Sequence, residues 1–280
     1  MRAFLSGRIL RRLRRNLSAQ AGLAVILAGI VLAVLAPAIV PHDPITPSLL
    51  ESRLPPSSKY LLGTDEMGQD ILSRIIYGFR ISLSIGIIST GIGLGAGVLI
   101  GAPSGYRGGT VDLWVMRLVD VMLAFPTILL AIIVVVVLGP GLRNAMIAVG
   151  LAQVPVYARL SRALVLKVRE EEFVDAAMAL GCSWVRILGR HILPNCLAPL
   201  IVQGSLTMGG AILEAAGLGF LGLGAQPPTP EWGTMLSKGR MYMWVAPHIA
   251  LFPGLAIMVT VLAFNLLGDG LRDVLDPRMA

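Results

Sequence analysis

The residue types that carry out covalent chemistry are few in this sequence, and they are not spaced for it. A phosphate-binding loop needs the pattern Gly-x4-Gly-Lys-Ser/Thr, in which the lysine follows a glycine and precedes a hydroxyl residue. The three lysines, Lys59, Lys167 and Lys238, do not stand in such a setting. Neither a Gly-x-Ser-x-Gly nucleophile elbow nor a serine–histidine–aspartate arrangement is visible. We therefore expect no catalytic residue, and no ATP or Mg²⁺ bound by this chain.

Metal-ligating side chains are equally sparse. The sequence has two cysteines, Cys182 and Cys196, and three histidines, His42, His191 and His248. They form neither a Cys-x-x-Cys pair nor a mixed cysteine–histidine cluster at the spacing of a zinc site. The sequence therefore predicts no metal site.

The composition is that of a membrane protein. Of 280 residues, 55% are hydrophobic and 14% are charged, with a mean hydropathy of +0.79. Soluble domains carry about a quarter charged residues, so these charges are too few to cover a globule of this size. The net charge of +7 does not indicate nucleic-acid binding, because the basic residues flank apolar runs instead of forming a patch interleaved with aromatic residues.

A helix needs about 20 apolar residues to cross the hydrocarbon core of a bilayer. Six stretches qualify, which predicts an all-α integral membrane protein with six transmembrane helices. They are residues 21–41, 81–102, 117–138, 144–160, 199–222 and 247–268. The fourth is the weakest, because it is short and contains Gln153 and Pro155, so five spans are the alternative count.

Basic residues predict the orientation of these spans. Arginines crowd residues 1–20, which the positive-inside rule assigns to the cytoplasm together with the C-terminal residues 269–280. With six spans, the inner segments hold 16 lysines and arginines and the outer segments hold 7. A cleaved signal peptide is the alternative for the N-terminus. We expect a membrane anchor instead, because the apolar run is too long for a signal peptide. In addition, Pro37 lies inside the only stretch of small residues that could serve as a cleavage site.

Two features inside the spans suggest roles beyond contact with lipid. Gly93, Gly97 and Gly101 recur every four residues, a small-residue face that allows another helix to approach closely. Glu214 is an ionisable group within the fifth span. Such groups are energetically unfavourable in a membrane and therefore usually have a functional or structural role. Glu214 is a candidate for the substrate pathway, and a hydrogen bond to a neighbouring helix is the alternative.

The charged segment 161–198 is too long for a simple connection between spans. Leu166 to Leu180 predicts one amphipathic helix, with Phe173, Ala176, Ala177 and Leu180 on one face. Gly181 follows at a position where a helix C-cap favours a positive φ angle. Ser183 is predicted to cap a second short helix, which we expect Pro194 to end.

These residues carry a resemblance to a known family. The run Asp175-Ala176-Ala177-x3-Gly181-x11-Leu193-Pro194 resembles the EAA loop of permeases of ATP-binding cassette (ABC) importers. Asp175 stands where that loop has glutamate, and His191 where it has isoleucine. Three further segments resemble the dipeptide, oligopeptide and nickel permeases, and specifically the second permease subunit. They are residues 62–74, 220–233 and 265–273.

The resemblance implies a type I ABC importer permease with a core at 81–268 and a cytoplasmic coupling loop at 161–198. Asp175, Ala176, Ala177, Gly181, Leu193 and Pro194 would couple the chain to an ATPase. The implied partners are a homologous permease, two ATPase domains that bind ATP and Mg²⁺, an extracytoplasmic substrate-binding protein, the lipid bilayer and a peptide substrate, with no nucleic acid. The expected place is the bacterial inner membrane.

The cargo and the mode of energy supply have alternatives. The resemblance favours dipeptides or short peptides, and nickel, longer oligopeptides or glutathione are the alternatives. An ion-coupled carrier is the alternative machine, although such carriers show internal repeats and this chain shows none.

The outer segment 42–80 is expected to contain an amphipathic helix. Its apolar residues Ile71, Leu72, Ile75, Ile76 and Phe79 form one stripe opposite Asp70, Ser73 and Arg74. This pattern predicts a helix lying at the outer surface, either as part of a landing surface for the binding protein or packed against the bundle.

Overall fold

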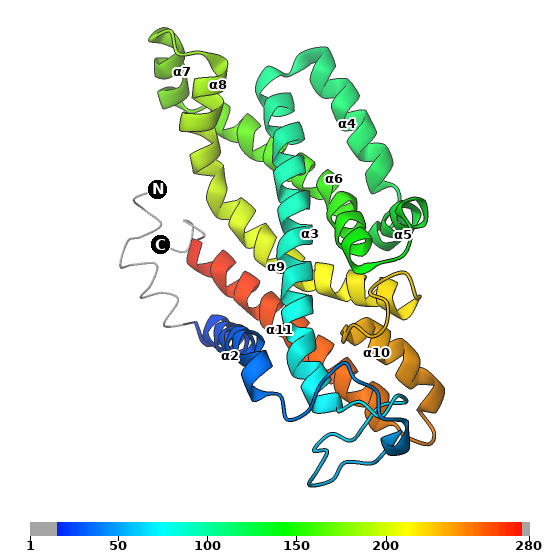
Figure 1. The fold of residues 1–280 in the computed structure, drawn as a ribbon. Helices are drawn as coiled ribbons and strands as arrows, with labels where there is room; N and C mark the ends of the chain where they lie inside the picture. The colour runs from blue at the N-terminus through cyan, green and yellow to red at the C-terminus, as the bar shows by residue number, and fades with distance from the viewer. Residues whose placement is uncertain (1–15, 276–280) are drawn as a thin grey trace.

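A computed structural model describes residues 16–275 of the chain, and this part is a bundle of long helices without a β-strand (Figure 1). The arginine-rich N-terminal residues that predict orientation lie outside the described range. The principal helices are α2 (Leu17–Ile39), α3 (Ile71–Arg107), α4 (Gly109–Leu123), α5 (Thr127–Leu138), α6 (Leu142–Arg169), α9 (Leu193–Phe220) and α11 (His248–Leu275). Shorter elements are η1 (Leu49–Glu51), α7 (Glu172–Ala179), α8 (Trp184–Arg186), the π-helical turn η2 (Ile187–Ile192), α10 (Trp232–Gly239) and η3 (Arg240–Tyr242).

Helices α3 and α6 form the centre of the bundle and meet along the predicted glycine face. A Cβ atom added at Gly93 would lie 2.9 Å from the Gln153 Cβ, one added at Gly97 would lie closer still to the Tyr157 Cβ, and one added at Gly101 would lie closest of the three, against the Ala158 carbonyl oxygen. Real Cβ atoms essentially never approach other atoms within 3.0 Å. The prediction that these glycines mediate helix packing is therefore confirmed, and the partner is α6 of the same chain.

Helix α3 corrects the prediction of a separate surface helix in 42–80. Its 37 residues run without a break from Ile71, so the expected surface helix and the span predicted at 81–102 are parts of one continuous helix. Asp70 begins the helix by accepting a hydrogen bond from the Ser73 backbone N–H at 3.0 Å. The chain has no helix breaker before Pro103, and at 1.5 Å per residue the helix is about 55 Å long. Ile71 and Phe79 are buried in the bundle.

The span predicted at 117–138 is also corrected, because two helices share this region. Helix α4 ends at Leu123, and α5 begins at Thr127 after a bend of 94°. Pro126 explains the break, since proline has no N–H to donate and disfavours helical geometry in the residue before it. On α4, Asp120 forms an ion pair with Arg159 of α6.

By length and composition, fewer of the described helices qualify as membrane spans than the six that the sequence predicts. Four described stretches are long and apolar enough to cross a membrane, namely α2, α3, Trp184–Phe220 and α11. Counting the bent pair α4–α5 as one span gives five. Helix α6 covers the fourth predicted span and is 28 residues long, but it carries polar residues such as Gln153 and Arg159. Six spans therefore stay a prediction that depends on α6.

The bundle has two different ends (Figure 1). The short helices α7 and α8 project at one end, and the irregular segment between α2 and α3 lies at the other, beside α10 and the start of α11. Helix α11 packs against α2 and α9 and continues to Leu275, two turns beyond the predicted end of its span. The Asn16 amide donates a hydrogen bond to Asp273 at 3.2 Å, which joins the start of α2 to the end of α11.

The glycine face leads to a first prediction. Replacing Gly101 by alanine would place a methyl group against the Ala158 carbonyl of α6, so α3 and α6 must separate. We expect Gly101→Ala to lower the free energy of unfolding by about 1–3 kcal/mol, measured as a lower unfolding midpoint in detergent. The matched control is Gly95→Ala on the same helix, where nothing lies within 4 Å of the added atom. Equal midpoints for the two variants would contradict the packing role.

Candidate functional site

The coupling segment is defined here as residues 170–183, between α6 and α8. The sequence predicts one helix from Leu166 to Leu180, but α6 ends at Arg169 and α7 begins at Glu172. Three consecutive glutamates stand at this break, and Glu171 is extended. Acidic groups favour the N-terminus of a helix, where the backbone N–H groups are unpaired. They therefore favour a new helix start at Glu172 over continuation of α6.

Helix α7 is anchored by two side chains and exposes the rest. Val174 and Ala177 are buried against Ile187, Leu188 and Ile192. The face predicted from Phe173, Ala176, Ala177 and Leu180 is wrong in part, because only Ala177 of these four points inward. The buried residues are instead Val174 and Ala177, at positions i and i+3. They form the narrow apolar stripe by which this two-turn helix packs against its neighbours.

The outward side of α7 carries small, acidic and apolar side chains next to one another. Asp175 and Ala176 are exposed, and Leu180 at the end of the helix is 84% exposed. Alanine projects little beyond the backbone, so another surface can approach α7 closely. This arrangement leaves a solvent-facing helix that has no covering element in residues 16–275.

Gly181 ends α7 in the predicted way. Its φ angle is +76°, which side chains disfavour. The Gly181 N–H donates to the Met178 carbonyl at 2.9 Å, and the Cys182 N–H donates to the Ala177 carbonyl at 3.1 Å. These two bonds form a Schellman motif. The predicted C-cap is therefore confirmed, and Gly181 sets the direction in which the chain leaves α7.

The prediction that Pro194 ends a helix is wrong. Helix α8 passes through the π-helical turn η2 directly into α9, and Pro194 lies in the first turn of α9. Proline is tolerated there because the wider π turn changes the bonding partners of the preceding residues. Ser183 precedes α8, but its side chain makes no capping hydrogen bond. Leu193 packs against the apolar cluster beneath α7.

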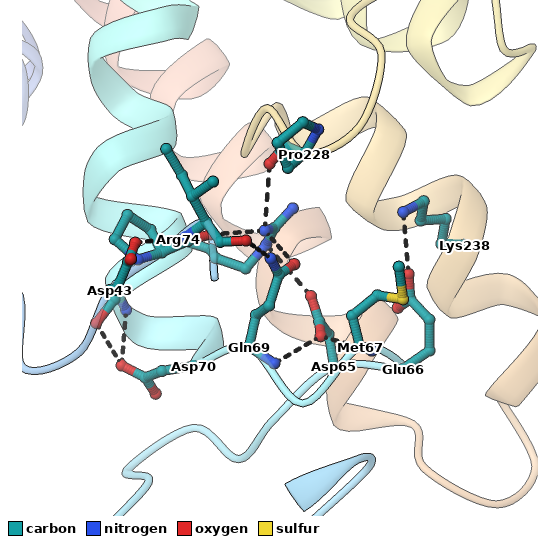
Figure 2. Close-up of polar contacts among 12 residues, drawn as sticks. Asp43, Asp65, Glu66, Met67, Gln69, Asp70, Arg74, Pro228 and Lys238 are labelled. Carbon is teal, nitrogen blue, oxygen red and sulfur yellow. Dashed lines mark hydrogen bonds and ion pairs between the residues drawn. The ribbon is translucent and has the colours of Figure 1, made fainter. Parts of the chain in front are cut away.

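At the opposite end of the bundle, Arg74 holds a polar cluster together (Figure 2). Its side chain is 3% exposed. The Nε atom lies 3.3 Å from an Asp65 carboxylate oxygen, and Nη1 donates to the Pro44 carbonyl at 2.7 Å and to the Gln69 side-chain oxygen. Nη1 also lies 3.5 Å from the Pro228 carbonyl. One guanidinium group thus joins α3 to the segment before it and to the loop after α9.

Asp65 has a structural role in this cluster. Burial raises the pKa of Asp65, and the Arg74 guanidinium opposes that rise. The carboxylate also accepts hydrogen bonds from the backbone N–H groups of Met67 and Gln69 at 2.9 Å. Beside it, Lys238 of α10 lies 3.2 Å from the Glu66 carboxylate. The residues of the 62–74 motif therefore fix the conformation of a loop.

The residues 231–233 are structural in the same way. Glu231 is buried and begins α10 by accepting hydrogen bonds from the backbone N–H groups of Gly233 at 2.7 Å and Thr234 at 2.8 Å. The fully buried Trp232 donates its indole N–H to the Ile75 carbonyl at 3.2 Å. The sequence indicates these positions only through the resemblance, because a single N-cap residue and one buried indole leave no periodic pattern.

Glu214 makes the interhelix hydrogen bond that was the alternative to a pathway role. The Thr127 hydroxyl at the start of α5 donates to Glu214 Oε1 at 2.8 Å. The second carboxylate oxygen is buried and accepts no hydrogen bond from the described residues. Glu214 thus links α9 to the helix that follows the bend after α4. This geometry does not test a pathway role.

Comparison with known proteins identifies the class of this bundle. Residues 93–280 match the family described as binding-protein-dependent transport system inner membrane component, and residues 5–56 match the N-terminal transmembrane domain of oligopeptide transport permease C. The chain is therefore a non-catalytic transmembrane subunit of an ABC importer. It belongs to the binding-protein-dependent transport system inner membrane component family.

Similar proteins include several peptide permeases. The chain is 48% identical to the dipeptide transport system permease protein DppC of Alkalihalophilus pseudofirmus, with 96% of this chain and 88% of that one covered. It is 46% identical to the di/tripeptide permease DppC of Pseudomonas aeruginosa, covering 94% and 89%. It is also 46% identical to the glutathione permease GsiD of Pectobacterium atrosepticum, covering 96% and 89%.

The fold is similar to a solved structure as well. A chain of the MetNI methionine ABC transporter, in an inward-facing conformation, matches with a TM-score of 0.59 at 19% identity. The match covers 74% of this chain and 98% of that one. At this identity the likeness concerns the fold alone, and it confirms the prediction of a type I ABC importer permease fold.

The Arg74 cluster leads to a second prediction. Lysine keeps the charge but not the planar fork of donors, so Arg74→Lys leaves buried acceptors at Asp65 or Pro44 without a partner. We expect a loss of about 1–3 kcal/mol in the free energy of unfolding, measured by denaturation of the purified protein in detergent. Arg80→Lys is the matched control, because Arg80 is exposed on the same helix. A control as destabilised as Arg74→Lys would contradict the role of the cluster.

Proposed function

We propose that this chain forms, with a homologous permease chain, the pathway by which dipeptides or short peptides cross the inner membrane. Separate ATPase subunits drive the transport, and an extracytoplasmic binding protein delivers the substrate. The observation that carries the coupling part of this proposal is the exposed helix α7, seated by Val174 and Ala177 and ended by Gly181.

The coupling residues form one region in this proposal. Asp175 and Ala176 on the outward side of α7 contact the ATPase, and Ala177 seats the helix. Gly181 sets the angle of the chain that follows. Leu193 and Pro194, at the start of α9, receive the displacement through the π turn. Support for this comes from the continuous helix Trp184–Phe220, which joins the exposed end to the middle of the bundle.

The orientation is part of the proposal. The end with α7 faces the cytoplasm, together with both chain termini, and the segment between α2 and α3 faces outward. The excess of basic residues in the predicted inner segments, 16 against 7, supports this orientation. Helix α6 is the fourth span in chain order and completes the count of six, and its polar residue Gln153 is 5% exposed and lies in the α3 interface.

The cargo proposal follows the named relatives. Permeases named for dipeptides, di/tripeptides and glutathione are 46–48% identical to this chain. Their cargoes share the chemistry of a short peptide with a free ammonium group and free carboxylates. We therefore propose a short peptide as cargo, with a dipeptide favoured by the dipeptide permease with 48% identity. Nickel and longer oligopeptides are outcomes that the uptake experiment separates.

A pathway role of Glu214 is proposed alongside its structural one. Thr127 occupies one carboxylate oxygen, and the second is buried without a hydrogen bond in this conformation, so it would meet the ammonium group of a peptide when the helices around it separate. The two roles are compatible because different oxygen atoms serve them.

A third prediction tests this role. Glu214→Gln retains a carbonyl oxygen for the Thr127 hydroxyl but removes the negative charge. We expect the KM of uptake to rise at least about tenfold for dipeptides with a free N-terminus. The KM for N-acetylated dipeptides is expected to stay unchanged, and it serves as the internal control. An equal rise for both substrates would contradict a contact with the ammonium group.

A fourth prediction tests the function itself. In proteoliposomes that contain this chain with its permease, ATPase and binding-protein partners, we expect labelled dipeptide to accumulate only with ATP. Gly181→Ala strains the cap of α7 and is expected to lower uptake at least about fivefold. Gly95→Ala is the control, because Gly95 is exposed on α3, outside the coupling segment and the π turn, and nothing lies within 4 Å of the added atom.

The competing cargoes and machines give different results in the same assay. Excess unlabelled glutathione, oligopeptide or nickel competes if it is the true cargo. ATP-dependent transport of one of these without dipeptide transport would retain the ABC importer and replace the cargo. Uptake that follows an ion gradient and ignores ATP would contradict the proposal.

A further inference from the structure

Two aromatic rings and two guanidinium groups connect the coupling segment to α3. Trp184 begins α8, directly after the coupling segment, and its ring lies 4.5 Å from the Arg107 guanidinium carbon. The ring also stacks on Tyr106, with centroids 6.4 Å apart and an interplanar angle of 28°. Arg169, the last residue of α6, lies 5.6 Å above the Tyr106 ring and donates to the Tyr106 carbonyl at 2.8 Å. We call these four residues the aromatic clamp.

The clamp joins segments that the chain does not join. Tyr106 and Arg107 are the last residues of α3, Arg169 ends α6, and Trp184 starts the helical run into α9. In Figure 1 these ends lie together at the end of the bundle that carries α7 and α8. The coupling segment is thus held from both of its flanks, at Arg169 and at Trp184, against the same end of α3.

We propose that Trp184 and Arg107 are positioning residues that make the coupling segment and the corner between α3 and α4 move as one body. This inference rests on the proposed function, because it concerns how a displacement of α7 reaches the membrane helices. The chain connection from α7 leads only to α6 and α9. The clamp adds α3 and α4 to the helices that follow the displacement.

The corner itself is built to transmit such a movement to α4. Gly108 and Gly109 both have positive φ angles, +66° and +65°, and turn the chain sharply after the clamp. Beyond the turn, Asp112 accepts hydrogen bonds from Arg162 Nε at 2.6 Å and from Ser104 at 2.6 Å. Helix α4 is therefore fastened to α3 and to α6 within its first turn.

Direction distinguishes the clamp from the apolar contacts beneath α7. Burial of apolar surface is non-directional, so Val174 and Ala177 hold α7 down without fixing its angle. A cation above an aromatic ring and a stacked ring pair have preferred geometries. The clamp therefore fixes which part of α8 faces which residues of α3, and it does so at the surface, where an incoming partner displaces α7.

A distance measurement tests the inference directly. Spin labels are placed at Ala179 in α7 and at Thr110 in the corner, both exposed. Cys182 is replaced by alanine, and the fully buried Cys196 is retained. In the complete transporter, we expect one narrow distance distribution that is the same without nucleotide and with trapped ATP. With Trp184→Ala, the distribution is expected to broaden and to change between the two states.

The controls separate the clamp from a general effect on folding. Trp184→Phe keeps an aromatic face and is expected to retain the narrow distribution. Val185→Ala alters an exposed neighbour in the same short helix and is expected to have no effect. Arg107→Gln removes the exposed cation without leaving a cavity, so it is expected to broaden the distribution even if Trp184→Ala fails to assemble.

The functional measure is the number of peptides transported per ATP hydrolysed. We expect Trp184→Ala and Arg107→Gln to lower this ratio at least about fivefold, with Trp184→Phe and Val185→Ala near the unmodified protein. A label distance that changes between nucleotide states in the unmodified transporter would overturn the inference, as would clamp variants with an unchanged ratio. Absence of ATP-dependent uptake by the unmodified transporter would contradict the proposed function, and the label distance would still decide the inference.

Discussion

The contact between α3 and α6 is the one on which the rest of the structure depends. Lipid tails are as apolar as leucine side chains, so helices in a bilayer associate through close packing and interhelix hydrogen bonds instead of a hydrophobic drive. Gly97 and Gly101 supply the close packing, and the Ser161 hydroxyl donates to the Gly97 carbonyl at 3.3 Å. This contact lets α6 carry polar residues through the middle of the bundle and support the coupling segment at its end.

The two ends of the bundle are organised in opposite ways. At one end, the buried Arg74 joins three segments through an ion pair with Asp65 and hydrogen bonds to backbone carbonyls. At the other end, α7 rests on two buried side chains and exposes the remainder. A buried polar network that depends on one guanidinium group, here that of Arg74, resists small displacements, because a displacement breaks hydrogen bonds of buried groups. A short helix on a narrow apolar stripe is held by fewer contacts and leaves most of its surface exposed, which suits the coupling role proposed for α7.

The sequence correctly predicts features that depend on local spacing. Its predictions are wrong or missing for features that depend on the direction of the chain in space. The glycine face at Gly97 and Gly101 and the cap at Gly181 follow from spacing and φ preference, and both are confirmed. The sequence does not predict the bend before Pro126. Apolar residues continue on both sides of it, and a hydropathy pattern carries no information on the direction of the helix axis. The sequence predicts a helix end at Pro194, whereas a preceding π turn allows α9 to begin there. The Arg74 cluster joins residues 154 positions apart, a separation that no periodic pattern reports.

The residues that carry the family resemblance explain why one scaffold serves several cargoes. Asp65, Arg74, Glu231 and Trp232 are buried and are occupied in caps, loops and interhelix hydrogen bonds. Such groups fix the ends of helices, and none of them is free to bind a cargo. In the proposed function, selectivity therefore lies with side chains on the faces that enclose the pathway, and not with these caps. The chain has comparable identity to permeases named for dipeptides and for glutathione, and this fits such a division, because caps and interhelix hydrogen bonds do not depend on the cargo.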